Sequence, residues 1–105
     1  MSRYTRVADS SEVPPGSAKA CVVGGRQVAL FNVEGAFYAL ENVCPHQGAP
    51  LSDGYLEGPL LTCSWHAWCF DVRTGKMSLA DIKVVPTYDV RVEGTSVTIS
   101  AEPRL

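Results

Sequence analysis

The chain contains two histidines, and each follows a cysteine at a short spacing. Cys44 precedes His46 in the stretch CPHQGAPLSDG, and Cys63 precedes His66 in the stretch CSWHAWCFDVRTG. Scarce residue types rarely repeat such an arrangement by chance, so the duplication indicates a shared role. Thiolate and imidazole are strong ligands for soft and borderline metal ions. The two pairs therefore predict a metal site built from two loops.

Two kinds of metal site compete for these four ligands. A structural zinc site takes two cysteines and two histidines, but its usual spacing places both cysteines on one knuckle and both histidines on another. Here each loop offers one of each type. That mixed pairing suits a two-iron cluster with two thiolates on one iron and two imidazoles on the other. A zinc-binding interaction module remains an alternative, whereas a Cys63–His66 nucleophilic dyad lacks a marked third residue or oxyanion site.

Strands on both sides of this segment must position the ligands. Residues 18–40 read as three apolar runs separated by Gly-Gly and Glu-Gly turns, which is typical of consecutive hairpins because glycine adopts positive φ at little cost. Residues 88–92 and 96–100 alternate apolar and polar side chains across a Glu-Gly-Thr turn, which predicts a hairpin with one buried face. Residues 59–63 and 68–72 are expected to form two shorter strands.

The rest of the sequence favours one small β domain. Only residues 9–13 indicate a helical turn, which Pro14 and Pro15 would end. We expect an all-β fold over residues 1–105, a small antiparallel sandwich or open barrel. The ligand-bearing subdomain, residues about 42–74, would be inserted between its strands.

Composition excludes several classes of partner. The formal net charge is −2 and no basic run occurs, so a nucleic-acid partner is not expected. No apolar stretch is long enough to cross a membrane, and the start MSRYTRVADSSEV has no signal-type segment. We therefore expect a cytoplasmic protein that does not bind membranes, with its thiols reduced. Oligomeric state is open from these patterns, and we expect a monomer.

The two cysteines outside the pairs have simpler explanations. Cys21 lies in an apolar run and is expected to be a small buried hydrophobe. Trp68, Phe70 and Val72 alternate with polar neighbours, and their face is expected to be core. Cys69 would then face away as a spare thiol. A Cys21–Cys69 disulfide is not expected in a reducing compartment.

The two ligand stretches resemble the cluster loops of Rieske-type ferredoxins, the soluble electron carriers of multicomponent oxygenase systems. The family pattern Cys-X-His followed by Cys-X-X-His matches at all four positions, and the resemblance covers nearly the whole chain. It implies one [2Fe–2S] cluster per chain. Cys44 and Cys63 would hold the inner iron, and His46 and His66 the outer iron through Nδ1.

By the same resemblance the chain is an electron carrier and not itself an enzyme. It would take electrons from an NAD(P)H-dependent flavin reductase and pass them to a terminal oxygenase, often one that hydroxylates aromatic rings. Small subunits of nitrite reductases share the fold and are the alternative. Many of those subunits lack the ligands, whereas this chain retains all four.

The resemblance also predicts a low reduction potential. High-potential respiratory relatives carry an extra cysteine in each loop, and a serine and a tyrosine hydroxyl against the cluster sulfurs. The matching positions here are Ala49, Trp65, Trp68 and Phe70. Because hydrogen bonds to the sulfurs stabilise the reduced cluster, their loss predicts a midpoint of roughly −150 to −100 mV.

Other residues near the ligands carry expectations from the resemblance. Gln47 would lie beside His46 and contact a partner, and Gly48 would help to aim backbone N–H groups at the sulfides. Trp65 would shield the cluster. Ala67 replaces the usual glycine, which costs on the order of 1 kcal/mol if the position needs positive φ. Pro86 resembles part of the family's third loop, which covers the cluster.

Overall fold

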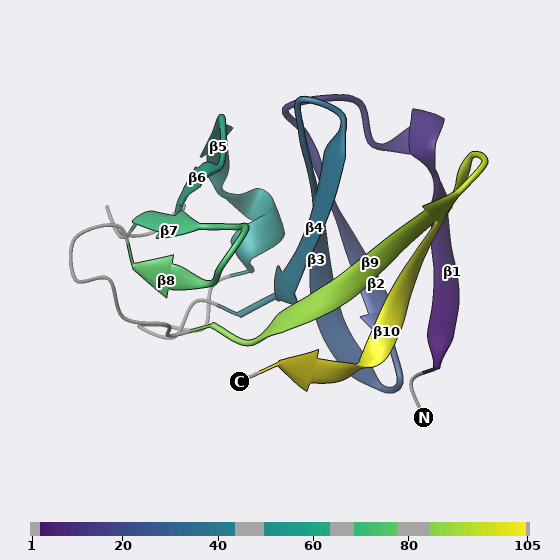
Figure 1. Ribbon diagram of the computed structural model, residues 1–105. Coiled ribbons are helices and arrows are strands. Elements are labelled where there is room, and N and C mark those ends of the chain that lie inside the picture. Colours follow the sequence, from purple (N-terminus) through teal and green to yellow (C-terminus); the bar gives the residue numbers. More distant parts are fainter. Residues whose placement is uncertain (1–2, 44–49, 64–68, 78–84, 105) are drawn as a thin grey trace.

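The computed structural model describes residues 3–43, 50–63, 69–77 and 85–104. In this part of the chain, six strands form one antiparallel sheet and four short strands form a second, smaller one (Figure 1). The strand order is β1-β10-β9-β4-β3-β2 in the large sheet and β5-β6-β7-β8 in the small one. The bounds are β1 Tyr4–Asp9, β2 Ala18–Val23, β3 Arg26–Val33, β4 Ala36–Glu41, β5 Tyr55–Glu57, β6 Leu60–Thr62, β7 Cys69–Asp71, β8 Lys76–Met77, β9 Thr87–Glu93 and β10 Ser96–Arg104, with 3₁₀ turns η1 Ser10–Glu12 and η2 Leu51–Asp53.

The large sheet is built from the predicted hairpins and nearly closes on itself. Strands β2, β3 and β4 pair consecutively, and β9 pairs with β10. In the β3–β4 turn Glu34 has φ 52° and Gly35 has φ 95°, a conformation that hairpin twist favours and that costs an ordinary side chain energy. Strand β1 pairs with β10 at one edge and also contacts β2. The two edges of the sheet therefore lie near each other.

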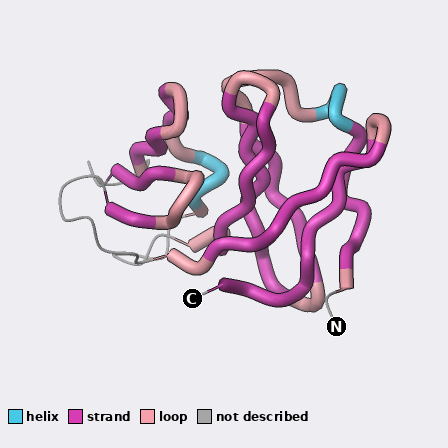
Figure 2. Tube along the Cα trace, viewed as in Figure 1, coloured by secondary structure: helices cyan, strands magenta, loops and turns pink. Residues whose placement is uncertain are grey.

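The small sheet is inserted between β4 and β9, as predicted, and lies beside the large sheet (Figures 1 and 2). Leu61 pairs with Leu56 and Phe70, and Phe70 pairs with Met77, so these side chains share one face of the sheet. Leu61 and Phe70 are fully buried, whereas Tyr55 on the opposite face is 77% exposed. The prediction that the Phe70 face belongs to the core is confirmed.

Two apolar cores hold these sheets. The barrel core lies inside the large sheet and contains Ala8, Val13, Val23, Val28, Leu30, Ala39, Tyr88, Val97 and Ile99. The interface core joins the large sheet to the inserted subdomain and contains Ala29, Phe31, Leu40, Leu51, Leu61, Cys63, Phe70, Val72 and Val85. Burial of apolar surface stabilises a fold by about 25 cal/mol per Å². The side chains of the interface core come from both the barrel and the subdomain, so their burial holds the two together.

The predicted turn at residues 9–13 is present as η1. Asp9 accepts a hydrogen bond from the Ser11 N–H at 3.0 Å, and the Asp9 N–H donates to Glu12 Oε1 at 2.7 Å. This reciprocal capping satisfies backbone donors that a short turn leaves open. Across the residues that the structure describes, no helix has the length and apolar character that a membrane span requires.

Candidate metal centre

Cys63 is the one predicted ligand that lies among the described residues. It follows β6 directly, is 3% exposed and belongs to the interface core. The other three predicted ligands, Cys44, His46 and His66, lie outside the described residues, as do Gln47, Gly48, Ala49, Trp65, Ala67 and Trp68. Among the described side chains, no group of three or more ligand-type residues comes together. What the structure does show is how the chain enters and leaves the predicted loops.

The segment 44–49 is closed at its base by a pair of side-chain hydrogen bonds. Asn42 Nδ2 donates to Ser52 Oγ at 3.0 Å, and the Ser52 N–H donates to Asn42 Oδ1 at 2.8 Å. Asn42 is 4% exposed, and its own N–H donates to the Gln27 carbonyl of β3 at 2.9 Å. We call this pair of contacts the Asn42–Ser52 clamp. It holds both ends of the first predicted ligand loop against the large sheet.

The segment 64–68 begins and ends on adjacent strands. Thr62 of β6 pairs with Cys69 of β7, and Thr62 Oγ1 lies 3.4 Å from Cys69 Sγ. Cys63 thus leaves the sheet directly beside the point at which the chain returns. Cys69 faces away from Phe70, as predicted, and its thiol contacts the hydroxyl of Thr62 across the strand pair.

The segment 78–84 is closed by a backbone contact between Gly75 and Val85. The Val85 N–H donates to the Gly75 carbonyl at 3.2 Å. Gly75 has φ +75°, and a Cβ atom there would overlap the Val85 carbonyl oxygen. Glycine is therefore required at this position both for its backbone conformation and for the close approach of the backbone at Val85.

Glu41 connects the base of the 44–49 segment to the base of the 78–84 segment. Its N–H donates to the Pro86 carbonyl at 3.0 Å, and its carboxylate accepts from Tyr88 Oη at 2.7 Å and lies 3.5 Å from Arg26 Nη1. Burial and the hydrogen bond to Glu41 raise the pKa of Tyr88 to about 12. Pro86 precedes β9, an inner strand of the large sheet, and is half-buried. Its expected role over the cluster involves a segment outside the described residues.

The environment of Cys63 fits a soft metal ion. A thiolate removed from water is costly unless a positive charge compensates it, and a metal ion supplies such a charge while keeping the thiol deprotonated. Cys63 belongs to the same buried cluster as Leu51, Leu61 and Val85, which lie near the ends of the three closed segments. The arrangement therefore favours a buried metal thiolate at Cys63 over a solvent-facing nucleophile.

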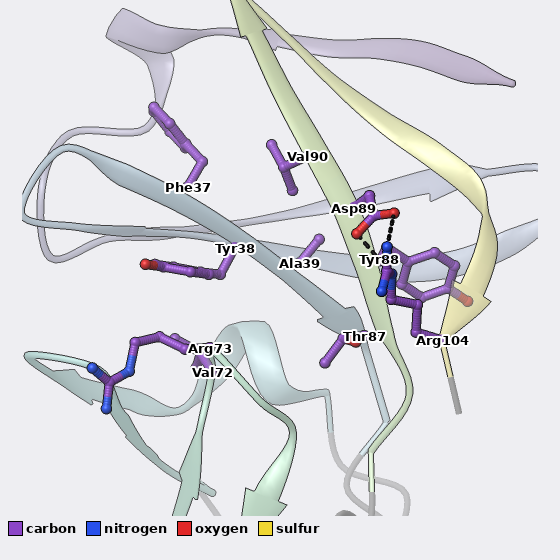
Figure 3. A pocket seen from close by; sticks show the side chains of 10 residues that line it. All are labelled: Phe37, Tyr38, Ala39, Val72, Arg73, Thr87, Tyr88, Asp89, Val90 and Arg104. Atoms are coloured by element: carbon purple, nitrogen blue, oxygen red, sulfur yellow. Dashed lines mark hydrogen bonds and ion pairs between the residues drawn. The ribbon is translucent and has the colours of Figure 1, made fainter. Parts of the chain in front are cut away.

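A groove of about 390 Å³ runs between the barrel and the subdomain on another side (Figure 3). Ion pairs occupy its walls: Arg73 Nη2 lies 2.8 Å from Asp71 Oδ2, and Arg104 Nε lies 2.9 Å from Asp89 Oδ1. The Arg73 hydrogen bonds hold the pKa of Asp71 below its usual range. Cys63 is not part of its lining, and the groove marks the polar border of the interface core.

Cys21 differs from its prediction. It is half-buried, because β2 is the edge strand of the large sheet and only one side of it packs on the barrel core. This burial raises the pKa of its thiol. No disulfide joins the described cysteines Cys21, Cys63 and Cys69, in agreement with the sequence prediction.

Sequence reasoning missed the residues that close the three segments. Asn42, Ser52, Glu41 and Gly75 were not singled out, although Asn and Ser beside a loop are known to bond to nearby backbone. The residue types were visible in the sequence. The residues that they contact lie across the predicted loops, and only the packing of the fold brings them together.

Comparisons with known proteins agree with this geometry. The sequence matches the Rieske [2Fe–2S] domain family over residues 3–99. It is 42% identical over 89 residues to the ferredoxin component of a naphthalene 1,2-dioxygenase system from Pseudomonas aeruginosa, covering 84% of this chain and 86% of the relative. The structure matches the ferredoxin of carbazole 1,9a-dioxygenase from Nocardioides aromaticivorans IC177 with a TM-score of 0.87 at 32% identity, covering 94% and 98% of the two chains. A structure described as a nitrite reductase small subunit from Mycobacterium tuberculosis has the same TM-score at 24% identity, covering 95% and 96%, which shows a shared fold alone.

Proposed function

The chain belongs to the Rieske [2Fe–2S] domain family and is an electron carrier of the ferredoxin type, and we propose that it delivers single electrons to a terminal oxygenase that acts on aromatic rings. Membership of the family implies one [2Fe–2S] cluster per chain, in one domain that we take as residues 1–105. The observation that carries the proposal is the 42% identity, over 84% of the chain, to the ferredoxin component of a naphthalene 1,2-dioxygenase system.

We propose that Cys44 and Cys63 ligate one iron and that His46 and His66 ligate the other. The mixed spacing of the two loops supports this assignment, and so does the 3% exposure of Cys63. A cysteine side chain at such a depth suits the inner end of a cluster. The two imidazoles would then form the outer end, at which a partner can exchange electrons.

When bound, the cluster supplies a site that accepts and releases one electron at a time. The described residues provide the support for that site: the Asn42–Ser52 clamp, the Thr62–Cys69 strand pair and the Gly75–Val85 contact fix the chain on either side of it. A rigid support keeps the ligand geometry similar in both oxidation states. Phe70, at a position where high-potential relatives carry a hydroxyl, is buried and apolar, which supports a midpoint of roughly −150 to −100 mV.

The partners follow from the relatives. The named relatives belong to dioxygenase systems for naphthalene and carbazole, so we propose a flavin-dependent reductase as donor and a ring-hydroxylating oxygenase as acceptor. We further propose that the protein works as a monomer in the cytoplasm and meets neither nucleic acid nor membranes.

Metal analysis of the purified protein tests the cofactor and its ligands. We expect two iron atoms and two acid-labile sulfides per chain, a red-brown colour and an EPR signal upon reduction. Cys63→Ser should abolish all three, whereas the matched control Cys21→Ser, which changes a half-buried cysteine on an edge strand, should keep them. One zinc per chain without iron or sulfide would contradict the proposal, as would full iron content in Cys63→Ser.

Reconstitution tests the direction of electron flow. With NAD(P)H and a flavin reductase, the protein should become reduced and should support substrate oxidation by a naphthalene-type oxygenase. Voltammetry should place the midpoint below zero. A midpoint above zero, or co-purification with a nitrite reductase large subunit that accepts its electrons, would refute the oxygenase assignment.

A further inference from the structure

The Asn42–Ser52 clamp joins the two ends of the first predicted ligand loop through a single side chain. A single amide satisfies both the backbone N–H and the hydroxyl of Ser52, at 2.8 and 3.0 Å. The same residue is tied to β3 through its own N–H and the Gln27 carbonyl. One buried residue therefore connects the end of the loop to its beginning through its side chain, and to the barrel through its backbone.

We propose that Asn42 is a positioning residue for the cluster: its amide sets the separation of the two ends of the loop that carries Cys44 and His46. This inference rests on the proposed function, because it takes those two residues to be ligands. Asn42 acts through its contacts with Ser52 and Gln27. Loss of its side chain is therefore expected to speed the release of the cluster.

A second buried asparagine provides a natural contrast. Asn32 is also 4% exposed. Its Nδ2 donates to the Val13 carbonyl at 2.7 Å, and its Oδ1 accepts from the Gly35 N–H at 2.8 Å. The two asparagines thus match in residue type, exposure and number of side-chain hydrogen bonds.

Their positions in the fold are what differ. Asn32 pairs with Phe37 near the β3–β4 turn, whereas Asn42 follows the other end of β4. Asn42 follows Phe37, the partner of Asn32, by five positions along the strand, which corresponds to about 16 Å. Loss of either side chain should weaken the fold, but only loss of Asn42 should release a ligand loop.

The experiment compares Asn42→Leu with Asn32→Leu in the cluster-loaded protein. Leucine has a similar size and no polar group, so Asn42→Leu leaves the N–H of the half-buried Ser52 without its acceptor. We expect the visible absorbance of Asn42→Leu to decay roughly tenfold faster than that of the wild type in an iron chelator at 25 °C. Asn32→Leu should lower the unfolding temperature as much as Asn42→Leu does. Its absorbance should nevertheless decay at a rate within about twofold of the wild type.

Two further variants and a second readout complete the test. Asn42→Asp keeps an acceptor for the Ser52 N–H and can accept a hydrogen bond from the Ser52 hydroxyl, so it should restore a slow decay. Ser52→Ala removes one of the two hydrogen bonds and should give an intermediate rate, even if Asn42→Leu fails to fold. Hydrogen exchange at the Ser52 amide should be slow in the wild type and faster in Asn42→Leu, with no change in Asn32→Leu.

The outcomes separate the clamp from the proposed function. If the absorbance decays equally fast in Asn42→Leu and Asn32→Leu, the effect is a general loss of stability and the positioning role of Asn42 is overturned. An unchanged decay rate in Asn42→Leu or Ser52→Ala would overturn it as well. Absence of iron from the wild-type protein would instead overturn the proposed function, and with it any ligand role for the loop.

Discussion

Gly54 connects η2 to β5 and lies against β6. Its replacement by alanine should disturb the support of the proposed metal site. A Cβ atom at Gly54 would overlap the Thr62 carbonyl oxygen and would lie 3.1 Å from Leu61 Cδ1 and 3.3 Å from the Leu51 carbonyl oxygen. The oxygen belongs to the backbone directly before Cys63, so it cannot swing away as a flexible side chain could. Gly54→Ala should therefore push η2 and β6 apart.

The size of the effect follows from two opposing contributions. Overpacking costs about 1–3 kcal/mol, and a backbone atom that cannot yield places this case near the upper end. Gly54 has φ −79°, which alanine adopts without strain, so the smaller entropy of the unfolded chain returns about 0.4–1 kcal/mol. The net loss is about 2 kcal/mol, or roughly 8–16 °C in the unfolding temperature of a domain of this size.

Circular dichroism of the cluster-loaded variant during heating measures this shift, with Gly94→Ala as the control. Gly94 has φ +62° and has no atom within 4 Å of an added Cβ, so alanine there meets backbone strain of about 1–2 kcal/mol, less the same entropic gain. Gly54→Ala should be the less stable of the two and should lose more iron at 25 °C. A Gly54→Ala protein as stable as Gly94→Ala would refute the steric argument.

Three smaller predictions test other features of the fold. Glu34→Asn should raise the urea midpoint of unfolding by an amount equivalent to about 0.5–1 kcal/mol, because asparagine tolerates the φ of 52° at this turn. Absorbance titration should find a tyrosine with a pKa of about 12 that disappears in Tyr88→Phe. Because that pKa lies above the usual 10, the stabilisation from the Tyr88 hydrogen bond to Glu41 should be complete below pH 10 and lost as the pH rises towards 12. In Cys69→Ser, alkylation of Cys21 followed by mass spectrometry should accelerate with pH to beyond 9, because burial raises the pKa of that thiol.

Because the small sheet is inserted between β4 and β9, a small barrel can carry the proposed metal site outside its own core. The subdomain connects to the barrel through residues 41–43 and 85–87, and Glu41 bonds to the backbone of Pro86 between these connections. The interface core then fixes the orientation of the small sheet. Variation in the inserted part can therefore change the site while the barrel core stays intact.

Local sequence patterns predicted most of the scaffold. The Gly-Gly and Glu-Gly turns, the pairing of the two strands on either side of Glu93 and the burial of Phe70 and Val72 are confirmed. The predicted buried face of the hairpin at Glu93 does not extend to its tip, where Val92 is 47% exposed. Each confirmed feature depends on near neighbours in the chain, because strand alternation and turn conformation are local properties. Strand β1 was missed because its partner β10 lies at the other end of the sequence and its own residues show no clear alternation.

The candidate site divides in the same way. Residue type and spacing alone predicted the ligand set and indicated the family and the class of chemistry, because a metal selects its donors by element and by their order on short loops. Only the tertiary structure decided that Cys63 is buried, that Asn42 holds Ser52 across a loop, and that Gly54 and Gly75 lie against backbone that tolerates no side chain. These contacts join residues separated by a loop or a strand, and their distances depend on how the interface core packs the small sheet against the barrel.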